Sequence, residues 1–117
     1  MLIEIPGIDE TAFKDLLDGN EELFISLISS FINKTPSAIS KLTPITQETL
    51  PEYARNIHGL KGACANICAE EARKMALSLE QKAKNGDLNG VLAENGDFLK
   101  YLDELMGNLQ KWLKNRK

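Results

Sequence analysis

Apolar residues recur along most of the chain at alternating intervals of three and four, the pattern of α-helices with one face in a core. The clearest such stretch runs from Thr49 to Ile67. Its apolar residues are Leu50, Tyr53, Ile57, Leu60, Cys64 and Ile67. Thr49 and Glu52 have the spacing of a capping box, and Pro51 is tolerated in a first helical turn. The pattern therefore predicts a helix that begins at Thr49 and buries this stripe.

Two further helices are predicted before this stretch. Asp9 can cap a short helix that ends at Gly19, and Asn20 can cap a longer one. The inner face of the short helix holds Phe13, Leu16 and Leu17, and that of the longer one holds Phe24, Ile28, Phe31, Thr35, Ala38 and Leu42. Because the three-four spacing continues across Pro36, we expect one long helix, kinked near this proline and closed by Pro44.

Two more helices are predicted after it. The chain turns around Cys68–Ala69, and the next helix ends at Asn85–Gly86, a pair typical of a left-handed C-cap. Its inner face is narrow and consists of Ala72, Ala76, Leu79 and Ala83. The last helix starts at Asp87, and its heptad-like stripe consists of Leu88, Leu92, Asn95, Leu99, Leu102, Met106, Leu109 and Leu113. Its segment Asn95–Gly96–Asp97 is able to split it, because glycine weakens a helix.

These patterns predict the fold class. No strand-like alternation occurs, so we expect an all-α protein, an antiparallel four-helix bundle with a short extra N-terminal helix. The 117 residues are 43% hydrophobic and 26% charged, which is the balance of a soluble globular protein. A chain of this length buries one core, so residues 1–117 are predicted to form a single domain.

Charge and hydropathy argue against two classes of function. The formal net charge is only −3, and no basic block occurs before the last few residues, which disfavours nucleic-acid binding. No apolar run approaches the roughly 20 residues that span a bilayer, and the first residues lack the basic flank and apolar run of a signal peptide. We therefore expect a cytoplasmic protein with no membrane segment.

Two cysteines and one histidine raise the question of a metal site. Cys64 and Cys68 are four residues apart and can share a helix face. His58 precedes Cys64 by six residues and is therefore well over half a turn out of phase with it around the helix. No second histidine exists to complete a zinc shell. We expect reduced structural thiols and no bound metal.

His58, the only histidine, is the candidate for chemistry. It lies one position away from the buried stripe of its helix, so its imidazole is predicted to point to solvent. Its neighbours at helical spacing are Pro51, Ala54, Arg55, Lys61, Gly62 and Ala65. Among them, Gly62 costs about 1 kcal/mol of helix stability relative to alanine, which favours a functional reason for a glycine in mid-helix.

A partner for His58 follows from the predicted hairpin. If the chain turns near Ala69, residues equally far from the turn lie level in the two helices, which sets Glu80 opposite His58. A carboxylate there accepts the Nδ1–H hydrogen bond and leaves Nε2 unprotonated and outward. Lys61, one turn along, can neutralise an anionic group on Nε2. Each of these residues alone has an ordinary surface role, and only their conjunction indicates a site.

A short set of motifs begins in this helix: His58-x-x-Lys61-Gly62, then Leu79–Glu80, then Asn85–Gly86–Asp87. Placed in an all-α domain of this size, they resemble a histidine-containing phosphotransfer (HPt) domain. The resemblance implies a two-component phosphorelay intermediate, in which His58 accepts a phosphoryl group from a receiver-domain aspartate and passes it to another receiver. It also implies that Lys61 and Glu80 assist the histidine and that Gly62 keeps it accessible. One departure is Cys68, because the family usually has glycine at this turn.

We therefore expect response-regulator receiver domains as partners, docking on Ala54, Arg55, Gly62 and Ala65. The chain contains no nucleotide-cradling glycine motif, so we expect no ATP site, no enzyme activity of its own and no cofactor. Mg²⁺ would be supplied by the receiver. We expect a monomer, either a stand-alone protein or a module of a hybrid histidine kinase. The alternative is a helical adaptor that has kept the fold without phosphotransfer.

Overall fold

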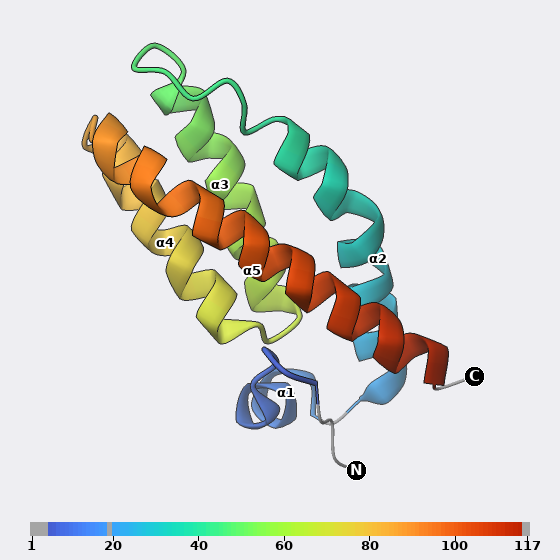
Figure 1. The fold of residues 1–117 in the computed structure, drawn as a ribbon. Coiled ribbons are helices and arrows are strands. Elements are labelled where there is room, and N and C mark those ends of the chain that lie inside the picture. The colour runs from blue at the N-terminus through green and yellow to red at the C-terminus, as the bar shows by residue number, and fades with distance from the viewer. Residues whose placement is uncertain (1–4, 19, 116–117) are drawn as a thin grey trace.

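Five α-helices make up the computed structural model, which describes residues 5–18 and 20–115. They are α1 (Glu10–Leu17), α2 (Glu21–Ser40), α3 (Leu50–Asn66), α4 (Glu70–Lys84) and α5 (Leu88–Asn115). Helices α2 to α5 form an elongated bundle in which consecutive helices run in opposite directions, and α1 lies at one end of it (Figure 1). No strand occurs in the described ranges, so the predicted all-α bundle with an extra N-terminal helix is confirmed. No helix in these ranges is both long and apolar enough to cross a membrane.

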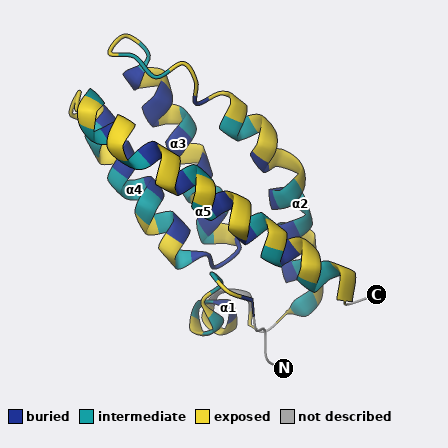
Figure 2. Cartoon of the chain, viewed as in Figure 1, coloured by how far each residue is buried: buried dark blue, intermediate teal, exposed yellow. Residues whose placement is uncertain are grey.

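The core runs along the inside of the bundle, where the buried faces of the long helices meet (Figure 2). At the end near α1, Phe13 packs edge-to-face on Phe24 with ring centroids 5.0 Å apart. Phe24 packs in the same way on Trp112 of α5, at 5.7 Å. The backbone N–H of Asp9 also donates to the carbonyl oxygen of Cys68 at 2.8 Å. These contacts attach α1 to both the core and the α3–α4 turn.

Both N-terminal helices begin at the predicted caps. The Oδ1 atom of Asp9 accepts from the backbone N–H of Ala12 at 3.0 Å, and that of Asn20 accepts from Leu23 at 3.0 Å. Helix α1 ends at Leu17, followed by Asp18 in the left-handed region with φ 51°. The predicted stop at Gly19 and the side chains of residues 16 and 17 lie outside the described residues.

Helix α2 continues through Pro36, as predicted, but it ends earlier than expected. It stops at Ser40, where the backbone N–H of Lys41 turns back to the carbonyl oxygens of Ala38 and Ile39. The prediction of a stop at Pro44 was therefore wrong by one turn. The physical reason is that the residue before a proline avoids the helical region, so the helix ends before Pro44 is reached.

Helix α3 begins where predicted, but the capping box is absent. Thr49 is the N-cap residue, yet its side chain makes no hydrogen bond to the first turn of the helix. Its hydroxyl instead donates to the carbonyl oxygen of Pro44 at 2.8 Å and accepts from the backbone N–H of Thr46 at 2.9 Å. Because these bonds hold the hydroxyl in the preceding loop, it does not form the capping-box hydrogen bond. Pro51, in the first turn, is tolerated as predicted.

The α3–α4 hairpin follows the prediction closely. The inner face of α4 is buried and consists of Ala72, Ala76, Leu79, Glu80 and Ala83. Small side chains allow α4 to lie close along α3 (Figure 1). Cys68 adopts the left-handed conformation at the turn with φ 62°, where glycine is usual, and its side chain is buried. At the other end, Gly86 follows α4 with φ 72°, which confirms the predicted glycine C-cap.

Helix α5 differs from the prediction in the face that it buries. Its fully buried residues are Val91, Asn95, Phe98, Leu102, Leu105 and Leu109, which include only three residues of the predicted stripe. Four others of that stripe are partly buried against the core: Leu88, Leu99, Met106 and Leu113. Leu92, predicted to be buried, is 53% exposed. The helix is also not split at Asn95–Gly96–Asp97. Asn95 points inward, where its Oδ1 accepts from the hydroxyl of Tyr53 at 2.6 Å. This bond satisfies the buried amide oxygen inside a continuous helix.

Candidate functional site

The site centres on His58, in the middle of α3 on the side that faces α4. Its side chain is 65% exposed, as predicted from its position beside the buried stripe. The Nδ1 atom lies 2.8 Å from Oε2 of Glu80. Because an ionised carboxylate can only accept, this contact places the proton of a neutral ring on Nδ1. The Nε2 atom is then left with a free lone pair on the exposed side of the ring.

Glu80 is a buried carboxylate with three partners. Its side chain is 3% exposed, and Lys61 Nζ donates to Oε1 at 2.6 Å. Oε2 accepts from Lys84 Nζ at 3.0 Å in addition to His58. Burial by itself raises the pKa of Glu80, but the hydrogen bonds from Lys61, Lys84 and His58 outweigh it and lower the pKa from 4.5 to about 2. Glu80 is therefore an anion at neutral pH.

The structure brings together the three residues predicted to do the chemistry. His58 and Lys61 are one turn apart on α3, and Glu80 reaches both from α4. Lys61 is 24% exposed, and its ammonium is held by Glu80 beside the histidine rather than extended into solvent. Lys84 was not predicted to belong to this site. The pattern that could have found it is its position four residues after Glu80, where a Glu–Lys pair forms readily on a helix.

The predicted docking residues differ in how far they are exposed. Arg55 and Gly62 are exposed and Ala65 is half-buried. A Cβ atom built on Gly62 would meet nothing within 4 Å, so neither packing nor backbone conformation requires glycine there. The same is true of Gly59, which the sequence reasoning did not single out. Ala54, expected at the surface, is only 5% exposed because it lies on the side of α3 turned toward α4.

A hollow of about 560 Å³ lies beside the histidine. Its lining consists of Pro51, Ala54, Arg55, His58, Glu80, Ala83 and Lys84. Ala54 thus contributes to the floor of this hollow rather than to the outer surface. Two cations, Arg55 and Lys84, line this hollow together with His58. An anionic group approaching Nε2 would meet positive charge and small side chains.

The two cysteines lie apart from this chemistry. Cys64 and Cys68 are free and buried, as the sequence predicted. Burial raises the pKa of the Cys64 thiol to about 12, so it stays protonated at neutral pH. Within residues 5–18 and 20–115, no group of three or more histidine, cysteine, aspartate or glutamate side chains is arranged to hold a metal ion.

The structure is thus a helical bundle that presents its single histidine to solvent from the middle of a helix, with Nδ1 held by a carboxylate. Residues 26–112 match the family model of the Hpt domain, and this range contains His58, Lys61 and Glu80. The chain belongs to the Hpt domain family. Members of this family take part in two-component phosphorelays, with receiver domains as partners. Comparison with curated proteins and with solved structures gave no match.

Proposed function

We propose that this chain carries a phosphoryl group on His58, accepting it from the aspartate of one receiver domain and passing it to another. The observation that carries this proposal is the 2.8 Å contact between Nδ1 of His58 and the buried carboxylate of Glu80. It fixes the tautomer in which Nε2 is unprotonated and directed to solvent. A receiver can then approach a nucleophile that is already in the reactive form.

In the forward step, the Nε2 lone pair attacks the phosphorus of the receiver's aspartyl phosphate. A P–N bond forms, and the P–O bond breaks with its electron pair leaving on the aspartate carboxylate. The ring of His58 keeps its Nδ1 proton and becomes positively charged, and the Glu80 anion stabilises that charge at 2.8 Å. The reverse of these steps returns the phosphoryl group to a second receiver. Mg²⁺ and the reactive acyl phosphate belong to the receiver in this proposal.

Lys61 and Lys84 have a second role in this proposal. Both donate to Glu80, and both stand close to the histidine that becomes a phosphohistidine. The transferred group carries negative charge, so two ammonium groups nearby reduce the electrostatic cost of holding it. We further propose that the chain acts as a monomer in the cytoplasm, without an ATP site of its own. It serves either alone or as a module of a hybrid histidine kinase.

The decisive variant is His58→Gln, tested against the phosphorylated receivers of the source organism. The wild-type chain should take up an acid-labile phosphate, and the variant should take up none. Because His58 is largely exposed, the variant should keep the melting temperature of the wild type within a few degrees. Label that persists on the folded variant would place the phosphoryl group elsewhere. Absence of label on the wild type with every receiver would favour the adaptor alternative.

A further inference from the structure

The hollow beside His58, between α3 and α4, has the size of a small-molecule site. Its volume of about 560 Å³ falls within the range of about 300–1,000 Å³ that is typical of such sites. Pro51 and Ala54 line it from the first turns of α3, and Ala83 lines it from the last turn of α4. These three side chains are small and apolar. The hollow therefore offers a compact apolar group a place beside the imidazole.

The hollow also has two cations in its lining, one from each helix. They are Arg55 of α3 and Lys84 of α4. Arg55 is exposed and makes no ion pair with a residue that the structure describes. Lys84 donates to the same oxygen of Glu80 that His58 contacts, so its ammonium lies within two hydrogen-bond lengths of the ring. An anion in this hollow would therefore meet positive charge from both helices.

Glu80 is the only acidic residue in this lining, and its charge is already compensated. Its side chain is 3% exposed, and its oxygens accept from Lys61, Lys84 and His58. With the imidazole neutral, this cluster and Arg55 together hold three cations and one carboxylate, which leaves two positive charges unbalanced among them. A dianion matches this charge, and the guanidinium of Arg55 can bind a phosphate through two N–H groups.

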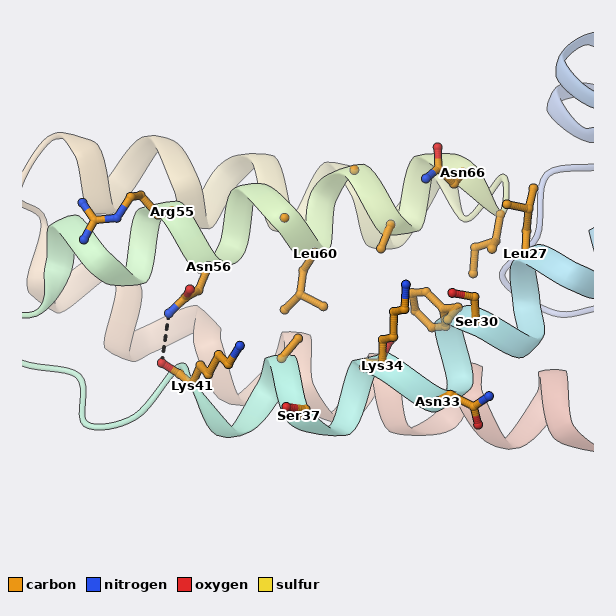
Figure 3. A pocket seen from close by; sticks show the side chains of 17 residues that line it. Leu27, Ser30, Asn33, Lys34, Ser37, Lys41, Arg55, Asn56, Leu60 and Asn66 are labelled. Atoms are coloured by element: carbon orange, nitrogen blue, oxygen red, sulfur yellow. Dashed lines mark hydrogen bonds between the residues drawn. The ribbon is translucent and has the colours of Figure 1, made fainter.

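A larger hollow, of about 810 Å³, lies on the other side of α3, toward α2 (Figure 3). Arg55 is the only residue that the two linings have in common. Figure 3 shows its guanidinium extending away from Lys34 and Lys41, the two lysines that α2 contributes to the larger hollow. The side chain of Arg55 is therefore free to serve the hollow between α3 and α4.

We propose that the hollow between α3 and α4 binds a small organic phosphate monoester. Its phosphate lies between Arg55 and Lys84, and its compact apolar group lies on the small side chains of the lining. The bound molecule is next to His58, so it obstructs a phosphorylated receiver and slows the labelling of the histidine. This consequence rests on the proposed function, whereas the binding itself does not. The hollow thereby makes phosphoryl transfer sensitive to a small molecule.

The test of binding uses phenyl phosphate as the probe and the NMR resonances of the single histidine as the readout. The measurement is made at about pH 7.5, where a phosphate monoester is a dianion. Inorganic phosphate keeps the charged group without the apolar one, and phenyl sulfate keeps the apolar group with less charge. We expect phenyl phosphate to bind with a Kd of about 1 mM or below, and the other two anions to bind at least about fivefold more weakly.

Two arginine variants locate the binding. Arg55→Gln should weaken phenyl phosphate binding at least about tenfold. The matched control, Arg73→Gln, makes the same change on α4, where Arg73 pairs with Glu70 at 2.8 Å and lines neither hollow, and it should change binding by less than about twofold. Melting temperatures within a few degrees of the wild type show that both variants are folded. Equal binding by the wild type and Arg55→Gln would overturn the site. Inorganic phosphate that binds as tightly as phenyl phosphate would also overturn it, leaving an unspecific anion effect only.

The rate at which a phosphorylated receiver labels His58 tests the regulatory consequence. With the receiver below its KM, phenyl phosphate at a concentration equal to its Kd should lower the initial rate about twofold on the wild-type chain. The same concentration should have little effect on Arg55→Gln, which shows that the probe does not act on the receiver. An unchanged rate on the saturated wild type would overturn the regulation and leave the proposed function standing. If no receiver labels the wild-type chain, the proposed function fails, and the binding measurement still decides whether the hollow takes the phosphate monoester.

Discussion

At the scale of single residues, Glu80 decides the state of the site. A carboxylate with 3% of its side chain exposed is costly to ionise unless its oxygens are satisfied. Lys61, Lys84 and His58 supply three donors to its two oxygens. The same contacts orient the imidazole and hold two ammonium groups beside it. One buried carboxylate therefore links the stability of the α3–α4 hairpin to the reactivity of the histidine.

The pH dependence of stability should report this carboxylate. The pKa of Glu80 is about 2 in the folded chain against 4.5 for a free carboxyl, so its contribution is present above about pH 4.5 and is lost as the pH falls toward 2. Glu80→Gln should lower the free energy of unfolding at pH 7 by about 1–3 kcal/mol. The difference from the wild type should shrink between about pH 4.5 and 2. Urea unfolding at a series of pH values measures this difference.

A matched control for this experiment is Glu94→Gln. Glu94 pairs with Lys82 at 2.9 Å, but its side chain is 44% exposed, so the substitution should cost less than about 1 kcal/mol. If the Glu80→Gln and wild-type curves instead stay parallel from pH 7 down to pH 2, the Glu80 cluster does not carry the acid-sensitive stability that its contacts indicate.

The two lysines should contribute unequally to transfer. Lys61 lies closer to Glu80 than Lys84 does, 2.6 against 3.0 Å, and is less exposed, 24% against 63%. Lys61→Ala should slow phosphoryl transfer by about tenfold and Lys84→Ala by only a few-fold, because an exposed charge is screened by solvent. Single-turnover rates from a phosphorylated receiver measure both, with Lys82→Ala as the control. Loss of transfer in Lys61→Ala as complete as in His58→Gln would show that Lys61 is part of the chemistry itself.

At the scale of helices, the hairpin that carries the site could be predicted because its pattern is local. The stripe of α3 and the small residues of α4 determine which faces meet, and the turn near Ala69 sets their register. This was enough to set Glu80 opposite His58. Cys68 in place of the usual glycine did not change the register, because its left-handed backbone, at φ 62°, has the conformation that glycine would adopt there.

The errors lie where distant contacts decide. In α5, two rows of apolar residues overlap and share Asn95, Leu102 and Leu109, so spacing alone could not tell which row is buried. The row with Phe98 is buried, and Leu92 is left exposed. At α3, the hydroxyl of Thr49 bonds to the preceding loop, whose path the sequence pattern does not give. In both cases the local sequence allows two arrangements, and contacts with residues distant in the sequence determine which one forms.

The bond between Tyr53 and Asn95 is what makes a polar residue acceptable in the core face of α5. The two side chains are 2% and 8% exposed and 2.6 Å apart. Tyr53→Phe should lower the free energy of unfolding by about 1–3 kcal/mol, because it leaves the amide of Asn95 buried and unsatisfied. Asn95→Leu alone should also lower it, because the buried tyrosine hydroxyl then has no hydrogen-bond acceptor. The double variant should lose less than the sum of the two, as measured by urea unfolding of all four chains. Strict additivity would mean that the bond contributes nothing to the packing of α5 on α3.

At the scale of the whole molecule, the site and its surroundings were predictable to different degrees. His58, Lys61 and Glu80 belong to one hairpin and are linked by helical spacing and a single turn. A hollow of about 810 Å³ between α2 and α3 depends on how these two helices are placed, which no local spacing encodes. Lys34 and Lys41 look like ordinary surface lysines in the sequence, and only the assembled helices show that both line this hollow.

The exposed face of α3 illustrates a balance between stability and access across the molecule. The core of the bundle stabilises the fold, whereas Gly59 and Gly62 each cost up to about 1 kcal/mol of helix stability. Because a Cβ at Gly62 would meet nothing within 4 Å, Gly62→Gln should melt at an equal or higher temperature than the wild type. The long side chain would project from the exposed face of α3, one turn from His58. We therefore expect it to obstruct the receiver and remove most receiver-dependent phosphorylation while His58 itself is unchanged.

The chain provides a matched control in Gly96, which is also exposed in mid-helix with nothing within 4 Å of a Cβ position and lines neither hollow. Gly96→Gln should raise the melting temperature by a similar amount and transfer phosphoryl groups at the wild-type rate. Melting and transfer are measured on the same samples of all three chains. If Gly62→Gln is as active as Gly96→Gln, no partner needs the open surface at Gly62. That result would favour the adaptor alternative. If Gly62→Gln is instead destabilised, the glycine serves packing, contrary to the open space at this position, and access to His58 does not explain it.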